Sequence, residues 1–291
     1  MIYYNNTMER ILSESVNRRF RKGEAFTIIE VLVVITIIGL LASIVLITTK
    51  GARERAKIAK GLNFAAQVHH SLGAYAVGIW DLDNSVQDSS GYNNNGTIGG
   101  DPQFKCDSDD TPSGNGCSLE HDGNDYIYAM VGDWLGQNNI SWTVAAWFNS
   151  PSSGGPIIGI TSSPPGGAWN MPFLSLSSTA ILYAWAWGGG QINADVSFNK
   201  WHLGVVSYDF SEGIKLYVDG KLEASSSDTN YSASGSTDYW TTYISGAKPS
   251  GVPSYFTGKI DNVRIYQEAL SSAQIKKLYT KGLEKHKIAE K

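Results

Sequence analysis

The nine residues ISWTVAAWF, at positions 140–148, decide what kind of domain this chain builds. Apolar side chains recur there at every second position, as in a strand with one face in a core; they are Ile140, Trp142, Val144, Ala146 and Phe148. Farther along, LYVDGKL at 216–222 predicts a hairpin, because an Asp-Gly pair tolerates the positive φ angles of a type I′ turn. The sequence therefore predicts antiparallel sheets rather than a helical bundle.

Composition supports a folded, strand-rich body. The chain has 291 residues, of which 42% are hydrophobic and 17% charged, and it contains 31 glycines and 9 tryptophans. Such a chain is too apolar to be disordered, and few charges with many glycines and aromatics suit packed strands and tight turns. Residues 76–268 carry 20 Asp and Glu against 7 Lys and Arg, a net charge of −13. An acidic body lacks the basic surface that grips phosphates, so we expect no nucleic-acid partner.

A second feature is the run FTIIEVLVVITIIGLLASIVLITT at 26–49, whose single charge is Glu30. At about 1.5 Å per residue it spans roughly 36 Å, more than a hydrocarbon core of about 30 Å. We therefore predict a membrane-spanning helix. A carboxylate inside lipid costs about 2.5 to 3.5 kcal/mol, so Glu30 needs a partner.

The leader RKGEA at 21–25, followed by FTIIEVLVVI, resembles the prepilin signal of type IV pilins and type II secretion pseudopilins. The resemblance implies that a prepilin peptidase cuts between Ala25 and Phe26 and methylates the new amine. It also implies that Glu30 neutralises the terminus of a neighbouring copy in a helical filament. The family usually has Gly before the cut, so cleavage after Gly23 is the rival, although it spoils the spacing to Glu30.

The predicted organisation has four parts: a leader at 1–25, a membrane and assembly helix at 26–75, a head at 76–280 and a basic tail at 281–291. The true start is Met1 or Met8. Alanines and a leucine at helical spacing after Lys50 predict that the first helix continues to about Ser71. A short closing helix is expected from Ser271 to Tyr279, capped by Ser271 or Ser272.

Six segments of the body occur in an order that resembles the concanavalin A-like, laminin-G-like jelly roll: DSSGYNNNGT (88–97), LEHDGNDYI (119–127), WTVAAWF (142–148), WHLGVV (201–206), LYVDG (216–220) and GKIDNVRIY (258–266). The implied fold is mostly β, an antiparallel β-sandwich that follows the long N-terminal helix. In that family the first and last strands are neighbours. The resemblance therefore implies that Asp88, an oxygen near Asn94, and Asp261 share one calcium ion. Simple solubility is the competing explanation of the acidic charge.

Two further predictions concern the head. Cys106 and Cys117 bracket a polar stretch that cannot order itself, which predicts a disulfide and an oxidising exterior; two free thiols are the alternative. Aromatic rings stack on the apolar faces of sugars, and Trp185 and Trp187 lie on one side of a strand beside Gly188–Gly190. They are the predicted glycan contacts, chosen over other aromatics of the head; those are Trp134, Trp169, Tyr239, Trp240 and Tyr243.

The leading hypothesis for function is a structural subunit of a type IV pilus or pseudopilus that displays a lectin-like head. It would be anchored in the inner membrane as a precursor and then join copies of itself in an extracellular filament. The alternative is a minor or tip pilin that acts as a glycan- or protein-binding adhesin. A glycosidase is the third reading, but its paired carboxylates on one strand are missing, so we expect no enzyme.

Overall fold

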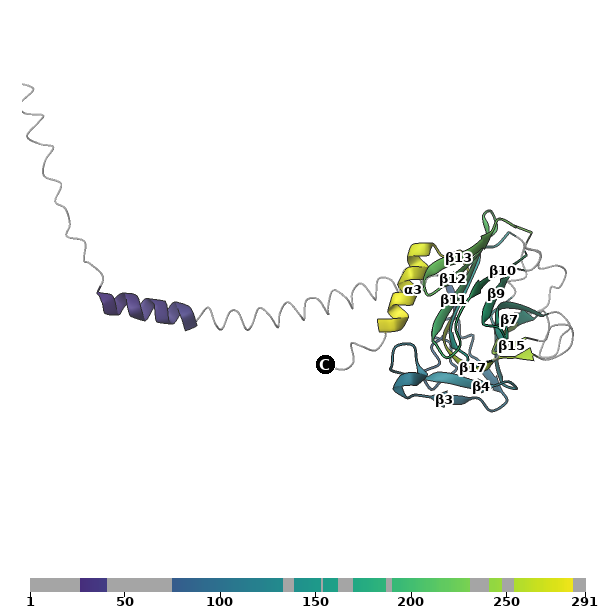
Figure 1. The fold of residues 1–291 in the computed structure, drawn as a ribbon, viewed down its shortest axis with the longest axis horizontal. Helices are drawn as coiled ribbons and strands as arrows, with labels where there is room; N and C mark the ends of the chain where they lie inside the picture. The colour runs from purple at the N-terminus through teal and green to yellow at the C-terminus, as the bar shows by residue number, and fades with distance from the viewer. Residues whose placement is uncertain are drawn as a thin grey trace, which may run out of the picture. The chain divides into compact units, whose positions relative to one another are not determined.

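A computed structural model describes the chain in separate stretches, which are residues 27–40, 75–132, 139–152, 154–161, 170–186, 190–230, 241–247 and 254–284. The chain divides into two compact units, Met1–Leu62 and Asn63–Lys291. The second unit holds the head, and Figure 1 shows its strands and its single labelled helix.

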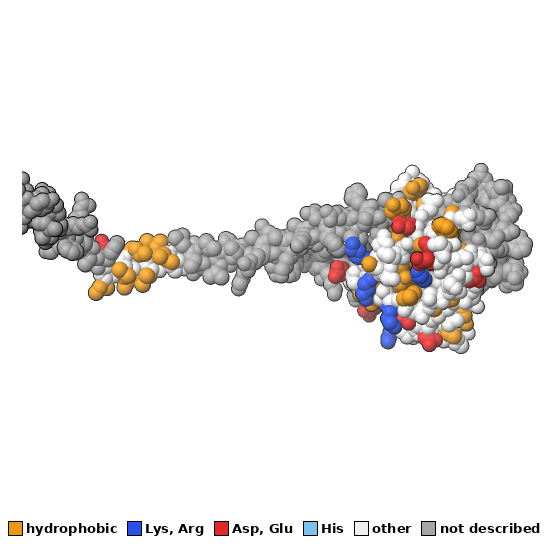
Figure 2. Space-filling view, turned by 90° about the horizontal axis from the view of Figure 1, so that it is seen from above, with side chains coloured by type: hydrophobic (Ala, Val, Ile, Leu, Met, Phe, Trp, Pro, Cys, Tyr) orange, Lys and Arg blue, Asp and Glu red, His pale blue; other side chains and the backbone are white. Residues whose placement is uncertain are grey.

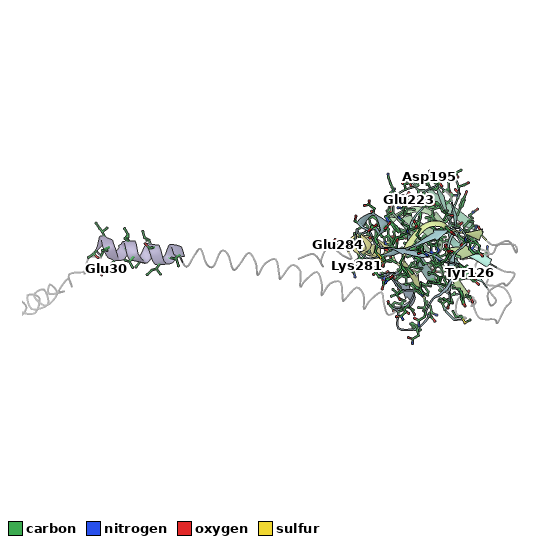
Figure 3. All side chains as sticks on the ribbon, turned by 90° about the horizontal axis from the view of Figure 1, so that it is seen from below. Glu30, Tyr126, Asp195, Glu223, Lys281 and Glu284 are labelled. Carbon is green, nitrogen blue, oxygen red and sulfur yellow. A yellow bond between two sulfur atoms is a disulfide. The ribbon has the colours of Figure 1, made fainter. Side chains whose placement is uncertain are left out.

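The first unit contains a helix at residues 28–40, whose side chains are mostly apolar and exposed (Figure 2). Thr27 and Glu30 form a capping box at its start (Figure 3 labels Glu30). The Thr27 backbone N–H donates to the Glu30 carboxylate at 2.8 Å, and the Glu30 N–H donates to the Thr27 hydroxyl at 3.3 Å. The rest of the predicted helix, to about Ser71, lies outside the described residues. Within the described stretches, no helix is long and apolar enough to cross a membrane.

The head is built from two antiparallel sheets, which we call sheet A and sheet B, as the jelly-roll resemblance implied. Sheet A runs in the order β13-β12-β11-β6-β17-β4-β3, with β1 also paired to β17. Its strands are β1 (Ala76–Trp80), β3 (Gln103–Lys105), β4 (Ser118–Asp122), β6 (Trp142–Asn149), β11 (His202–Asp209), β12 (Gly213–Val218), β13 (Lys221–Ser226) and β17 (Thr257–Tyr266).

Sheet B runs in the order β10-β9-β8-β7-β14-β5-β2. Its strands are β2 (Thr97–Gly99), β5 (Tyr126–Met130), β7 (Gly155–Thr161), β8 (Asn170–Leu176), β9 (Ile181–Trp185), β10 (Gln191–Asp195) and β14 (Thr241–Ile244). A small ribbon of β15 (Gly246–Ala247) and β16 (Ser254–Tyr255) follows β14, and a 3₁₀ turn, η1, covers Ser108–Asp110.

The main core lies between the two sheets. The strand predicted at 140–148 begins at Trp142, and its alternation is confirmed: Trp142, Val144, Ala146 and Phe148 are all in this core. Ile140 precedes the strand but still packs against the same core. The predicted hairpin is confirmed too, since β12 and β13 pair across Asp219 and Gly220, which have φ angles of 53° and 76°.

A second, smaller core lies between sheet A and helix α3 (Ser272–Glu284), which covers the outer face of this sheet (Figure 1). Ala145 and Trp147 of β6 belong to it, and the Trp147 ring stacks on Tyr279 at 5.5 Å between centroids. Ser271 caps α3 by exchanging hydrogen bonds with Gln274, as one of the two predicted caps. The helix runs beyond the predicted Tyr279 to Glu284, because Leu283 also packs against this core.

Candidate functional site

The two sheets differ in what covers their outer faces. In sheet A, strands such as β6 and β11 are buried on both sides, because α3 packs on the outer one. In sheet B the burial alternates: β5, β9 and β10 turn buried residues inward and more exposed residues outward. One covered and one solvated face is the usual state of an antiparallel sheet at a surface. Among the described residues, the outer face of sheet B is therefore the broad surface open to a partner.

Four tyrosines gather on this face, and we call Tyr126, Tyr128, Tyr243 and Tyr255 the tyrosine cluster. The Tyr126 ring is central: its centroid lies 5.8 Å from that of Tyr255, in a stacked arrangement, and 5.7 Å from that of Tyr243. The pairing of β14 with β5 sets Tyr243 directly beside Tyr128. Gly99 leaves room for the Tyr126 ring, because a Cβ at residue 99 would lie 2.3 Å from it and the ring would have to shift. Burial raises the pKa of Tyr243 from 10 to about 12.

A second aromatic group lies on β9 of the same sheet. Tyr183 and Trp185 point to the outer side, with ring centroids 5.5 Å apart. Trp185 also packs against the main core, so part of its ring is unavailable to a ligand. Trp187 lies outside the described residues, as do four of the other predicted candidates: Trp134, Trp169, Tyr239 and Trp240. The glycan role of Trp185 and Trp187 stays a prediction.

The predicted calcium ligands come from the loop after β1, which holds Asp88 and Asn94, and from β17, which holds Asp261. The first and last strands are indeed neighbours, since Trp80 of β1 pairs with Val263 of β17, and Asp88 forms a bridge with Trp80. However, the Asp88 carboxylate already accepts hydrogen bonds from protein groups; the donors are the backbone N–H groups of Ile79, Ser90 and Asn94 and the Ser90 hydroxyl. Asn94 in turn donates its amide to the Val77 carbonyl, and Asp261 is buried within β17. Asp88 therefore orders its own loop, and calcium at these residues stays a prediction.

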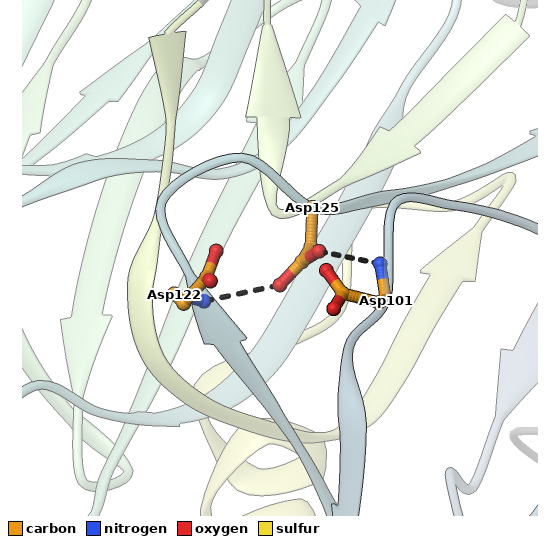
Figure 4. Close-up of side chains that lie close together, drawn as sticks. All are labelled: Asp101, Asp122 and Asp125. Carbon is orange, nitrogen blue, oxygen red and sulfur yellow. Dashed lines mark hydrogen bonds between the residues drawn. The ribbon is translucent and has the colours of Figure 1, made fainter.

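Another acidic group, which the sequence did not single out, lies on the β2–β3 connection, at the end of β4 and on the β4–β5 connection (Figure 4). Asp101, Asp122 and Asp125 place carboxylate oxygens within 4.8 Å of one another. Asp125 is buried, and its two oxygens accept the backbone N–H groups of Asp101 at 2.8 Å and Asp122 at 3.1 Å. These bonds join the connection before β3 to the turn after β4. We therefore assign Asp125 a structural role.

A chain of polar side chains joins Ser197, His202 and Asp219. Nε2 of His202 accepts from the backbone N–H of Ser197 at 3.2 Å and lies 2.9 Å from its hydroxyl oxygen, so the ring proton sits on Nδ1, 2.8 Å from Asp219. Such a chain has the order of a serine hydrolase triad. Here, though, the Asp219 carboxylate also accepts a hydrogen bond from the Leu203 N–H. Nε2 of His202 is contacted by both the hydroxyl and the backbone N–H of Ser197. The three residues thus pin the β10–β11 connection to the β12–β13 turn.

The remaining predicted residues have clear outcomes. Cys106 and Cys117 form the predicted disulfide. Ala25 and Phe26 lie outside the described residues, and Glu30 is placed at the first turn of its helix. The sequence analysis missed the capping box of Thr27 and Glu30, although the spacing T-x-x-E is a known signature of such a box. It also missed the tyrosine cluster, of which only Tyr243 was a candidate, because no local motif joins its members.

Together these features define a two-sheet, lectin-like head that follows an apolar N-terminal helix in the sequence. Residues 121–276, more than half of the chain, match the family model of the concanavalin A-like lectin/glucanases superfamily, and the chain belongs to that superfamily. Residues 21–46 match the prokaryotic N-terminal methylation motif, which is the type IV pilin signal. This match confirms the resemblance of the leader and first helix. No curated protein sequence matches the chain.

Several solved structures have similar folds at low sequence identity. Domain 4 of AbnA, a GH43 extracellular arabinanase from Geobacillus stearothermophilus solved with arabinotriose, has a TM-score of 0.52 and 18% identity, covering 70% of this chain and 98% of that domain. The receptor-binding domain of a botulinum neurotoxin C/D mosaic serotype has a TM-score of 0.52 and 16% identity, and the match covers 72% of this chain and 51% of that one. The binding domain of botulinum neurotoxin serotype G has a TM-score of 0.51 and 15% identity, and the match covers 70% of this chain and 50% of that one.

The chain spans about half the length of these neurotoxin domains, and at such identity the likeness shows the fold alone. The pilin signal and the lectin-like head both indicate a non-enzymatic protein, although one similar domain belongs to an arabinanase.

Proposed function

We propose that this chain is a pilin-like filament subunit that carries a lectin-like head for attachment to surfaces. The precursor is anchored in the inner membrane, cut by a prepilin peptidase before Phe26 and methylated there. Copies then assemble through their N-terminal helices into a type IV pilus or pseudopilus, with the heads outside the cell. The match of residues 21–46 to the methylation motif carries this proposal.

Glu30 allows a sharp test, because its carboxylate has two roles that substitutions can separate. In the subunit it caps its own helix, and in the filament it would neutralise a neighbour's amine. Glu30→Gln keeps a carbonyl oxygen for the cap but removes the charge, whereas Thr27→Val weakens the cap by about 1 kcal/mol and keeps the charge. We expect Glu30→Gln to abolish filaments and Thr27→Val to retain them.

The assay is electron microscopy and quantification of sheared filaments, together with mass spectrometry of the mature N-terminus. A methylated Phe26 in the wild type supports the processing step, and an N-terminus at Glu24 would place the cut after Gly23. Normal filaments from Glu30→Gln would show that the charge is dispensable and would overturn the proposed assembly.

A second candidate is a rare tip subunit that acts as an adhesin. The outer face of sheet B favours it, because among the described residues this face carries partly exposed aromatic side chains that suit direct contact with a ligand. Abundance separates the two: a major subunit dominates sheared filaments, while a tip subunit is barely detectable in them. Since a similar domain was solved in complex with arabinotriose, arabino-oligosaccharides are a suitable first probe of attachment.

A further inference from the structure

The charges of the head are distributed unevenly between its two sheets. The strands of sheet A each carry at least one charged or histidine side chain, apart from β1 and β6, which are buried on both sides. In sheet B, the strands β2, β5, β7, β8, β9 and β14 contain no Lys, Arg, Asp or Glu; only β10 contributes one, Asp195. An acidic domain has therefore kept one sheet almost free of charge.

The outward side chains of that sheet share a chemistry. Around the tyrosine cluster they are hydroxyl-bearing or apolar, such as Thr97 and the half-exposed Met130. Farther across the sheet, Ser175, Gln191 and Asn193 offer neutral hydrogen-bonding groups. Neutral donors and acceptors beside aromatic rings suit a ligand with many hydroxyl groups and apolar C–H faces. They do not suit a phosphate, a sulfate or an acidic peptide, which need cationic side chains.

The tyrosine cluster lies where a ligand could reach it. Figure 3 places Tyr126 on the opposite side of the head from Lys281 and Glu284 of α3, so the helix that closes sheet A does not cover it. The four rings are partly exposed and held by one another and by the strands beneath. Rings that are already ordered lose little conformational entropy on binding, and this favours them as a preformed platform.

We propose that the tyrosine cluster is a binding site for an uncharged glycan, whose sugar rings stack on the tyrosines while its hydroxyl groups bond to the neutral side chains around them. The inference deepens the proposed attachment function and rests on it. It moves the main glycan contact from Trp185 and Trp187 on β9 to β5, β14 and β16.

The experiment uses the full chain, purified in a detergent without a sugar headgroup and applied to an array of neutral, sialylated and sulfated glycans. We expect binding to neutral glycans only. The neutral ligand found is then titrated calorimetrically against Tyr128→Ala, against Tyr243→Phe, which keeps the ring and removes the hydroxyl, and against Phe210→Ala. Phe210 is the matched control, because it is an exposed aromatic at the β11–β12 turn of sheet A.

Tyr128→Ala should weaken binding by about tenfold or more, as truncation of an aromatic anchor does, while Phe210→Ala should leave it unchanged. Tyr243→Phe should retain most of the affinity and guards against loss of binding through misfolding. Unchanged binding by Tyr128→Ala overturns the site, as does binding restricted to acidic glycans or binding to no glycan. Filament assembly is measured separately. Filaments that form without glycan binding would therefore overturn the proposed glycan site but not the proposed filament role.

Discussion

The Cys106–Cys117 disulfide offers a quantitative test of how the head is stabilised. It closes a loop with a sequence separation of 11 residues, and this loop contains η1. On the chain-entropy model, closing such a loop removes about 9 cal/mol/K from the unfolded chain, or about 2.8 kcal/mol at 25 °C. The double variant Cys106→Ser/Cys117→Ser should therefore unfold more easily by about this amount. For a domain of this size, that lowers the melting temperature by roughly 6 to 11 °C.

The assay is thermal unfolding of the second unit, residues 63–291, followed by circular dichroism with and without a reducing agent. Reduction should lower the melting temperature of the wild type to that of the double variant and should leave the variant unaffected. Equal melting temperatures for oxidised and reduced wild type would refute the reasoning. That result would mean that contacts of the loop, such as the Asp110–Lys259 ion pair, already hold it in place.

Two further predictions concern contacts between distant segments. Thr143 is fully buried in β6, where its hydroxyl donates to the Glu268 carbonyl at 2.7 Å and accepts the Leu270 N–H at 2.9 Å. Thr143→Val should therefore cost about 1 to 3 kcal/mol in urea denaturation, and an unchanged midpoint would contradict the assignment. Ser207→Ala should cost less, because it removes only the longer 3.2 Å contact between the Ser207 and Thr143 hydroxyls. A hydrogen bond from Lys259 is the main cause that lowers the pKa of Asp110 below its ordinary 3.8. The stability it contributes, about 1 kcal/mol, is therefore present above pH 3.8 and is lost as the pH falls through the lowered value. Asp110→Asn should be less stable than the wild type at pH 7 and equally stable in strong acid, and a difference that persists in acid would argue against the ion pair.

Much of the architecture could be predicted because its signals are local. The two-residue period of apolar side chains in β6 predicts a strand, because successive side chains of a strand point to opposite faces in any surroundings. Asp219 and Gly220 predict a hairpin turn, because both tolerate the positive φ angles that such a turn needs, and this preference is local. The prepilin signal is likewise contiguous, so its leader, Phe26 and Glu30 could be interpreted before any tertiary structure was known.

What the sequence by itself determined about this protein is thus its parts: an apolar helix with a methylation motif, a jelly-roll head and a disulfide loop. Only the tertiary structure decided which of the described aromatic side chains of the head stay partly exposed. Trp147 and Trp185 both lie on outward-facing sides of strands, yet α3 covers the first, and only part of the second is buried. The tyrosine cluster exists because β5 pairs with β14, which brings Tyr128 beside Tyr243 from a distant part of the chain. Strand pairing of this kind depends on the packing of the whole domain, so no period or motif within one segment can encode it.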